Sequence, residues 1–191
     1  MVYRFLRILS RILFRLLYRV KIEGLQHVPA RGPTLLCSNH ISVLDPPFIA
    51  TFLSRKVRFM AKAELFENPL FGRLITYLGA FPVKRGGISK ETVKLALDLL
   101  RQGELMCIFP EGTRQGSAVM GKKGAASFAL KTGATVIPVA IIGNYRLFRP
   151  LKIIYGEAVD LEEFRETASS ENLEKATEKI MSSIRRLMDD H

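Results

Sequence analysis

TLLCSNHISVLD, residues 34–45, joins a short apolar run to a cluster of polar residues. A run of this kind is typical of a strand that is covered on both faces of its sheet. Further apolar runs alternate with segments of helical periodicity, at residues 57–61, 80–83, 105–109, 135–142 and 151–155. The alternation predicts a single α/β domain with a mostly parallel central sheet flanked by helices.

The helices of this domain are predicted at residues 44–53, 69–78, 89–102, 123–131 and 170–188. Ser89 suits the N-cap of a helix, and Gly79 and Gly103 suit the positions that end one. Ligands of such sheets bind at the carboxyl ends of the strands. Residues that directly follow a strand are therefore the candidates for function.

The charge of the chain points to an anionic partner. The 191 residues carry a formal net charge of +11. Residues 157–191 contain ten acidic and five basic side chains, so residues 1–156 carry +16. A surface this basic attracts nucleic acid, anionic lipid or a small phosphorylated substrate.

The cysteines and histidines suggest neither a disulfide framework nor a metal site. Cys37 and Cys107 each lie in an apolar run, which predicts buried, reduced thiols and a reducing compartment. The three histidines, His27, His40 and His191, show no spacing typical of metal ligands. We therefore expect no metal site.

Residues 1–20 repeat an arginine about once per helical turn, with no acidic residue before Glu23. The arginines are Arg4, Arg7, Arg11, Arg15 and Arg19. Charges this frequent exclude a membrane-spanning helix, and their interleaving with apolar residues excludes a secretory signal. The pattern predicts an amphipathic membrane-interface helix over 1–20, whose arginines bind anionic headgroups, followed by a domain over 21–191. Packing of the apolar face on the protein's own core, or on a partner protein, is the alternative.

The polar cluster after the first strand contains His40 and, five residues later, Asp45. A turn can bring the carboxylate to one imidazole nitrogen, which fixes the tautomer and leaves the other nitrogen free as a base. Ser42 is the nearest possible nucleophile, but the chain has no G-x-S-x-G elbow. A His–Asp dyad that deprotonates a substrate hydroxyl is the simpler reading. A buried histidine stabilised by an aspartate is the structural alternative.

Cations and a glycine follow two other predicted strands. PEGTR, residues 110–114, contains Gly112, where backbone can approach a ligand closely, and Arg114, whose planar guanidinium suits a phosphate. FPVKRGG, residues 81–87, adds two cations at another strand end. A general base, a carboxylate and several cations suit an anionic substrate with a reactive hydroxyl. A solvated basic surface is the alternative for the lysines at 122 and 123.

Read together, residues 39–45 and FPEGTR at 109–114 resemble the lysophosphatidic acid acyltransferase family, the 1-acyl-sn-glycerol-3-phosphate acyltransferases. FPVKR at 81–85 and VIPV at 136–139 resemble two further sequence blocks of that family. The order and the spacing of the four blocks agree, and the resemblance covers roughly residues 20–156.

The resemblance implies that His40 is the general base and Asp45 its orienting partner. It implies substrate-binding roles, with the phosphate on the basic residues, for Glu111, Gly112, Thr113, Arg114, Lys84 and Arg85. The acyl donor is expected to be acyl-CoA or acyl carrier protein, the acceptor a lysophospholipid and the product phosphatidic acid. No bound cofactor and no nucleic acid are implied, and the expected location is the cytoplasmic face of the membrane, peripheral or monotopic.

Other functions fit parts of the sequence. A non-catalytic basic membrane- or nucleic-acid-binding module explains the charge, but not polar motifs at separate strand ends. A hydrolase could use the same dyad with water, although the cations favour a phosphorylated acceptor. An acyltransferase that acts on glycerol 3-phosphate or another lysolipid needs similar chemistry and remains the nearest alternative.

Overall fold

The computed structural model describes residues 2–83, 89–110, 123–165 and 169–190. Within these ranges seven strands form one sheet in the order β1-β7-β6-β2-β5-β3-β4. The strands are β1 (Arg19–Glu23), β2 (Thr34–Ser38), β3 (Val57–Lys62), β4 (Ala80–Val83), β5 (Leu105–Ile108), β6 (Thr135–Gly143) and β7 (Pro150–Tyr155). Neighbouring strands are parallel except for β6 and β7, which confirms the predicted mostly parallel sheet.

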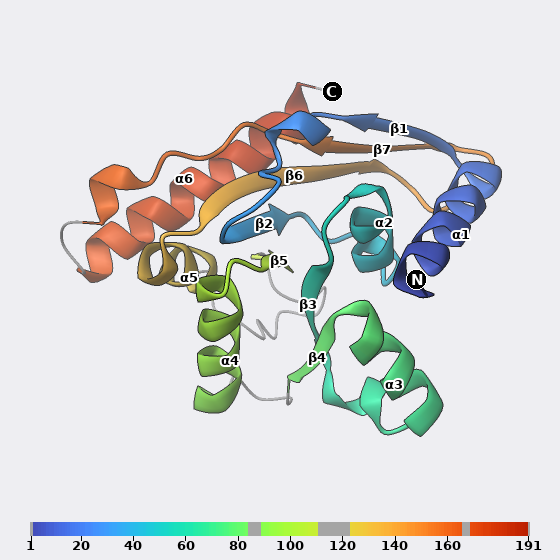
Figure 1. Ribbon diagram of the computed structural model, residues 1–191. Coiled ribbons are helices and arrows are strands. Elements are labelled where there is room, and N and C mark those ends of the chain that lie inside the picture. Colours follow the sequence, from blue (N-terminus) through green and yellow to red (C-terminus); the bar gives the residue numbers. More distant parts are fainter. Residues whose placement is uncertain (1, 84–88, 111–122, 166–168, 191) are drawn as a thin grey trace.

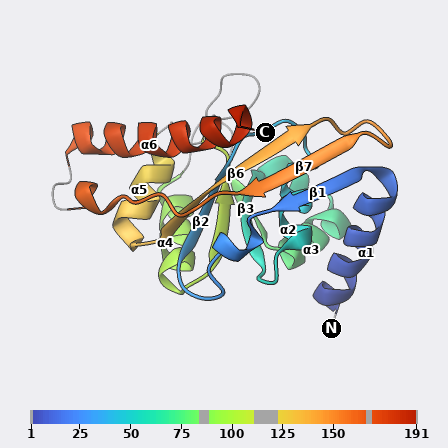
Figure 2. The same ribbon diagram turned by 90° about the horizontal axis from the view of Figure 1, so that it is seen from above.

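Helices cover both faces of the sheet. They are α1 (Val2–Leu17), α2 (Asp45–Phe52), α3 (Pro69–Leu78), α4 (Lys90–Arg101), α5 (Gly124–Thr132) and α6 (Ser170–Asp189), with the short 3-10 helices η1 (Leu25–His27), η2 (Ala63–Phe66) and η3 (Glu162–Phe164). In Figures 1 and 2, α4, α5 and α6 lie on one face and α1 and α2 on the other, while α3 stands beside β4.

The buried strand β2 shows how the two layers share the sheet. Leu35 and Cys37 pack into the core on the side of α4–α6, whereas Leu36 packs into the core on the side of α1 and α2. All three side chains are fully buried. The alternation places successive side chains on opposite faces, as the strand geometry requires.

The predicted elements after residue 20 are present, and each boundary lies within one residue of its prediction. The predicted helix over residues 1–20 is present, but its predicted end is wrong. The helix ends at Leu17, and the strand β1, which was not predicted, begins at Arg19. The short strand β1 is stabilised by parallel pairing with β7, which is more than 125 residues away in sequence. Arg19 therefore belongs to a strand and not to the helix that carries the other four arginines.

Candidate active site

The two residues of the predicted dyad lie at the carboxyl end of β2. His40 follows the strand by two residues, and Asp45 is the first residue of α2. Nδ1 of His40 lies 2.6 Å from Oδ2 of Asp45. The aspartate side chain is fully buried, whereas the imidazole is 22% exposed. The turn thus brings the two groups together and leaves the histidine open to solvent.

The carboxylate of Asp45 also organises the turn that carries His40. The backbone N–H groups of Ile41 and Ser42 both donate to Oδ2 of Asp45, each at 2.7 Å. Hydrogen bonds from several donors offset the cost of burying a charged group. The amides of Ile41 and Ser42 therefore already have an acceptor within the turn.

Hydrogen bonding fixes the tautomer of His40. A carboxylate only accepts hydrogen bonds, so the neutral imidazole carries its proton on Nδ1 and an unshared electron pair on Nε2. In the parts of the chain that the structure describes, no hydrogen bond occupies Nε2. The ring of Phe109 stacks on the imidazole with the centroids 4.2 Å apart and the planes 23° apart. Asp45 and Phe109 therefore limit the rotation of the imidazole, and Nε2 is left without a described partner.

Tyr145 is a member of the site that the sequence did not reveal. Its hydroxyl donates to Oδ1 of Asp45 at 2.7 Å. Its ring packs edge-on against Tyr18 and Phe48, which hold the hydroxyl in place. Tyr145 follows β6, which pairs with β2, so a search for polar residues after neighbouring strands could have found it.

Asn39 anchors the beginning of the turn that carries His40. Its side chain accepts a hydrogen bond from the amide of Ile141 at 2.8 Å and donates to the carbonyl of the same residue at 2.9 Å. Because Asn39 is buried and Ile141 lies in β6, the pair of bonds fixes the end of β2 on its neighbour. The backbone that leads to His40 is therefore held in a defined position.

The other predicted substrate-binding residues, Lys84, Arg85, Glu111, Gly112, Thr113 and Arg114, lie outside the described residues. The strands that precede them are described. β5 pairs with β2 so that Ile108 lies opposite Cys37, and Phe109 reaches His40. The start of the second motif and the dyad therefore share one edge of the sheet, as the sequence predicted.

Two polar side chains near the motifs have structural partners. The hydroxyl of Ser42 accepts a hydrogen bond from the amide of Leu44 at 3.2 Å, as expected for a turn residue. The ammonium group of Lys123 forms an ion pair with Glu174 of α6. Neither contact involves His40 or the carboxylate of Asp45.

The five arginines at the N-terminus form two groups, one bonded to the end of α2 and one exposed to solvent. Arg7 donates to the carbonyls of Leu53 and Ser54 at 2.6 and 2.8 Å, and Arg11 donates to the carbonyl of Thr51 at 3.2 Å. These carbonyls lie at the carboxyl end of α2, where a helix leaves acceptors unpaired. The side chains of Arg4, Arg15 and Arg19 are exposed.

Much of the apolar surface of α1 faces solvent. Phe14 is buried against α2, with its ring 5.1 Å from that of Phe48. Large apolar side chains that are at least half exposed lie on the opposite side, at Val2, Phe5, Ile8, Leu9, Ile12, Leu13 and Leu16. Core packing thus accounts for only one side of this helix. Among the residues that the structure describes, the helices include none with the length and hydrophobicity of a membrane span.

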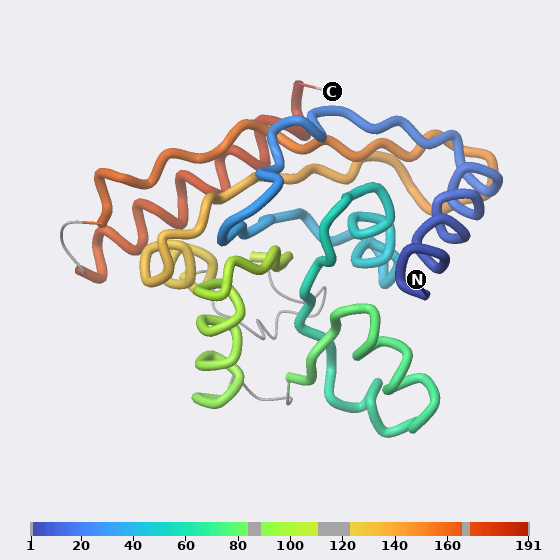
Figure 3. The backbone as a smooth tube through the Cα atoms, in the orientation of Figure 1, coloured from blue at the N-terminus to red at the C-terminus, as the bar shows by residue number. Residues whose placement is uncertain are grey.

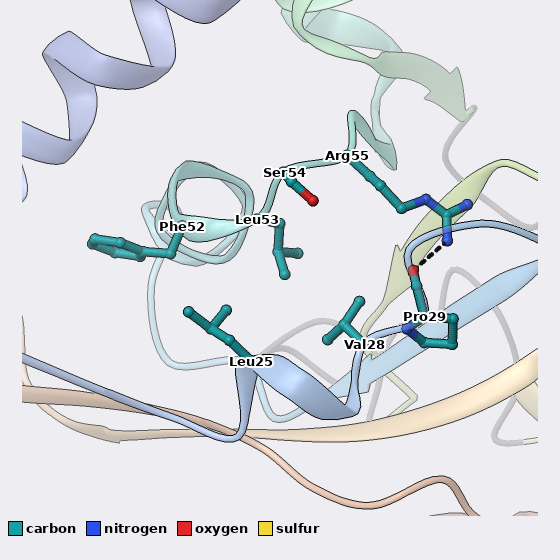
Figure 4. A pocket seen from close by; sticks show the side chains of 7 residues that line it. All are labelled: Leu25, Val28, Pro29, Phe52, Leu53, Ser54 and Arg55. Atoms are coloured by element: carbon teal, nitrogen blue, oxygen red, sulfur yellow. Dashed lines mark hydrogen bonds between the residues drawn. The ribbon is translucent and has the colours of Figure 1, made fainter.

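A cavity of about 210 Å³ lies away from the dyad, between η1 and the end of α2. Figure 4 shows its lining, which includes Leu25, Val28 and Arg55. The guanidinium of Arg55 bonds to Thr34, the first residue of β2, so the cavity lies at the amino end of the strand that leads to His40. Among the described residues, no group of three or more potential metal ligands is found.

Known acyltransferases resemble this chain over its length. A sequence profile described as "Acyltransferase" matches residues 19–142. The 1-acyl-sn-glycerol-3-phosphate acyltransferase of Bacillus subtilis (strain 168) is 30% identical over 191 residues, which cover 97% of this chain and 96% of the relative. A chloroplast 1-acyl-sn-glycerol-3-phosphate acyltransferase of Arabidopsis thaliana is 35% identical over 68% of this chain and 38% of its own length.

A solved structure shows the same fold. It is the crystal structure of the 1-acyl-sn-glycerophosphate acyltransferase PlsC from Thermotoga maritima. The TM-score is 0.74 and the sequence identity 27%, with 97% of this chain and 79% of that chain covered. The likeness extends over nearly the whole chain.

Proposed function

Because the chain belongs to the 1-acyl-sn-glycerol-3-phosphate acyltransferase family, we propose that it acylates the sn-2 hydroxyl of 1-acyl-sn-glycerol 3-phosphate and releases phosphatidic acid. The acyl donor in this proposal is a thioester, either acyl-CoA or acyl carrier protein. The observation that carries the proposal is the contact of 2.6 Å between His40 and Asp45, which leaves Nε2 of the histidine unoccupied by any described residue.

The proposed reaction uses His40 first as a base and then as an acid. Nε2 removes the proton from the acceptor hydroxyl while its oxygen attacks the thioester carbonyl carbon. The tetrahedral intermediate collapses, the C–S bond breaks, and the departing sulfur takes the proton from the imidazolium. A thioester is already activated, so we propose that the reaction needs no bound cofactor and no metal.

Asp45 and Tyr145 hold the base without touching the substrate in this proposal. The carboxylate keeps the proton of the neutral imidazole on Nδ1 and stabilises the imidazolium that forms during transfer. Tyr145 is a positioning residue, since it bonds to the oxygen of Asp45 that does not face His40. Phe109 limits rotation of the imidazole by stacking on it.

We assign recognition of the acceptor to the residues that follow β4 and β5. Lys84, Arg85 and Arg114 bind the phosphate, while the backbone and side chains of residues 111–113 hold the glycerol. The resemblance of residues 81–85 and 109–114 to the family's motifs supports this assignment. The contact between Phe109 and His40 supports it as well, because it sets the start of the second motif beside the base.

The enzyme acts, in this proposal, as a peripheral protein on the cytoplasmic face of a membrane. The exposed apolar side of α1 enters the lipid interface, and the exposed Arg4, Arg15 and Arg19 meet anionic headgroups. Arg7 and Arg11 are left out of this role because their guanidinium groups bind the end of α2.

Acyl transfer from both thioester donors to a panel of acceptors tests the proposal. The panel contains 1-acyl-sn-glycerol 3-phosphate, glycerol 3-phosphate and an uncharged lysolipid. We expect labelled phosphatidic acid as the main product, and Arg114→Ala should raise KM for the phosphorylated acceptor while KM for the donor stays unchanged. Release of free fatty acid as the main product would make the enzyme a hydrolase, and preference for another acceptor would reassign the substrate.

A further inference from the structure

We propose that the connection between β6 and β7, residues 144–149, forms a second contact with an anionic lipid surface. This inference rests on the proposed location of the enzyme at a membrane and extends it beyond α1. The relevant side chains are Leu147 and Phe148, which are exposed, and Arg146 and Arg149, which flank them. We call these four residues the lipid loop.

The apolar side chains of the lipid loop are exposed, and one of them belongs to a residue with an unfavourable backbone conformation. Leu147 is 58% exposed and Phe148 is 65% exposed. Phe148 has a φ of 61°, and it is the one non-glycine residue with positive φ among those the structure describes. That region is unfavourable for a bulky residue, and such outliers gather at functional sites. The amide of Arg149 donates to the carbonyl of Arg146 at 3.2 Å and closes the turn that contains this φ, but no packing within the protein explains why the residue there is an exposed phenylalanine.

Hydrogen bonds attach the lipid loop to the end of α1. The amide of Phe148 donates to the carbonyl of Leu17 at 2.7 Å, and the amide of Arg19 donates to the carbonyl of Arg149 at 3.0 Å. Figure 3 shows the connection lying against the last turn of α1, and the view in Figure 2 agrees. Leu16, at the same end of α1, is 67% exposed. The exposed apolar side of α1 and the apolar side chains of the lipid loop are therefore neighbours.

The charges around this surface select an anionic occupant. Arg15 and Arg19 from α1 and β1 join Arg146 and Arg149, and all four side chains are exposed. No acidic residue occurs in residues 1–22 or 140–156. Apolar side chains with a basic rim, in two segments without acidic residues, match an anionic lipid surface, in which the apolar groups enter the acyl region and the arginines meet headgroups.

The lipid loop also leads directly to the catalytic dyad. Tyr145 precedes Arg146 and donates to Asp45, which in turn holds His40. The acceptor of the proposed reaction is itself a lipid, so its hydroxyl must reach His40 from the membrane. A lipid contact beside Tyr145 places the membrane surface close to His40, so that the hydroxyl of a lipid acceptor can reach this residue.

Vesicle partition of the full chain tests the inference. In the double variant Leu147→Ser, Phe148→Asn, asparagine tolerates positive φ, so the fold should be kept or stabilised. The control, Leu95→Ser with Met188→Ser, removes apolar side chains that are 43% and 39% exposed on α4 and α6. With vesicles of phosphatidylcholine and phosphatidylglycerol, we expect the loop variant to partition about tenfold more weakly than wild type. The control variant should partition as wild type does. Equal partition of loop variant and wild type would overturn the inference.

Two further measurements separate the possible failures. Arg146→Gln with Arg149→Gln should weaken partition about thirtyfold on vesicles that contain phosphatidylglycerol and little on pure phosphatidylcholine. Sedimentation velocity without lipid should give the same mass for every variant; a change of mass confined to the loop variants would assign the loop to a second copy of the chain instead. Acyl transfer in detergent micelles reports on the proposed function independently, because it needs no vesicle.

Discussion

The polar side chains that lie at the two ends of β2, Arg55 and His40, differ in how the protein bonds them. At the amino end, Arg55 donates to the carbonyls of Pro29, Gly32 and Gly103 and to the hydroxyl of Thr34, over distances of 2.6 to 3.0 Å. At the carboxyl end, His40 bonds to Asp45 through Nδ1, no described residue bonds to Nε2, and the side chain is 22% exposed. The protein supplies partners for both terminal nitrogens of Arg55, whereas it holds His40 through one nitrogen and supplies no described partner for the other.

This difference distinguishes the structural site from the proposed catalytic site more clearly than burial or cavity size does. The cavity near Arg55 is lined largely by apolar side chains, and its one cation already has partners for its terminal nitrogens. The dyad lies at the carboxyl end, where an α/β sheet places its ligands. Changes at the two ends should therefore affect different quantities, activity at one end and stability at the other.

The largest effect is expected at the carboxyl end, from Asp45→Asn. The amide no longer holds the imidazole in the tautomer with a free Nε2, so kcat should fall at least about a thousandfold. Steady-state kinetics measure the loss, and Asp98→Asn, an exposed aspartate of α4, is the matched control. Activity within a few-fold of wild type would show that Asp45 only stabilises the turn.

At the amino end, Arg55→Ala should lower stability and leave the chemistry unchanged. Removing a charged donor from three carbonyls and a hydroxyl costs roughly 2–3 kcal/mol of the free energy of unfolding. Urea denaturation gives the value, while kcat per folded molecule should equal that of wild type. Arg58→Ala is the control, since its ion pair with Glu104 is partly exposed and contributes about 1 kcal/mol or less. A kcat loss in Arg55→Ala as large as in Asp45→Asn would erase the distinction between the ends.

Tyr145→Phe should produce a smaller effect at the dyad. Loss of a hydrogen bond to a charged group weakens the positioning of Asp45, and we expect kcat to fall about tenfold with both KM values unchanged. The matched control is Tyr155→Phe, which removes a buried hydroxyl that donates to the carbonyl of Ile49. If both variants lose the same activity and stability, the role of Tyr145 is structural.

The smallest expected effect is on the pH dependence of the free energy of unfolding, and it comes from two buried cysteines within the strands. Burial raises the pKa of the thiols of Cys37 and Cys107, on β2 and β5. An unfolded thiol loses its proton near pH 8.5, so the unfolded chain binds fewer protons than the folded one above about that pH. The thiols should thus lower the free energy of unfolding in the alkaline range and have no effect below it. Iodoacetamide should label both cysteines in urea and neither in the folded protein at neutral pH.

The sequence predicted the parts of this comparison that depend on local patterns. The strands, the helices after residue 20 and the His40–Asp45 pair could be predicted because each is encoded within a short segment. Tyr145 and Asp45 are 100 residues apart in sequence, and the partners of Arg7 lie 46 and 47 residues away. Such contacts depend on the order of strands in the sheet and on how α1 packs against α2, which no local pattern specifies. The strand β1 was missed for the same reason.

The most direct test of the central claim, that Nε2 of His40 is the base, is kcat of His40→Ala for acyl transfer to 1-acyl-sn-glycerol 3-phosphate. His27→Ala serves as the matched histidine control, because His27 bonds to a backbone carbonyl and lies outside the dyad. We expect a loss of at least about a thousandfold in His40→Ala with an unchanged unfolding transition, and a near-normal rate in the control. Transfer by His40→Ala at a rate close to that of wild type would contradict the claim.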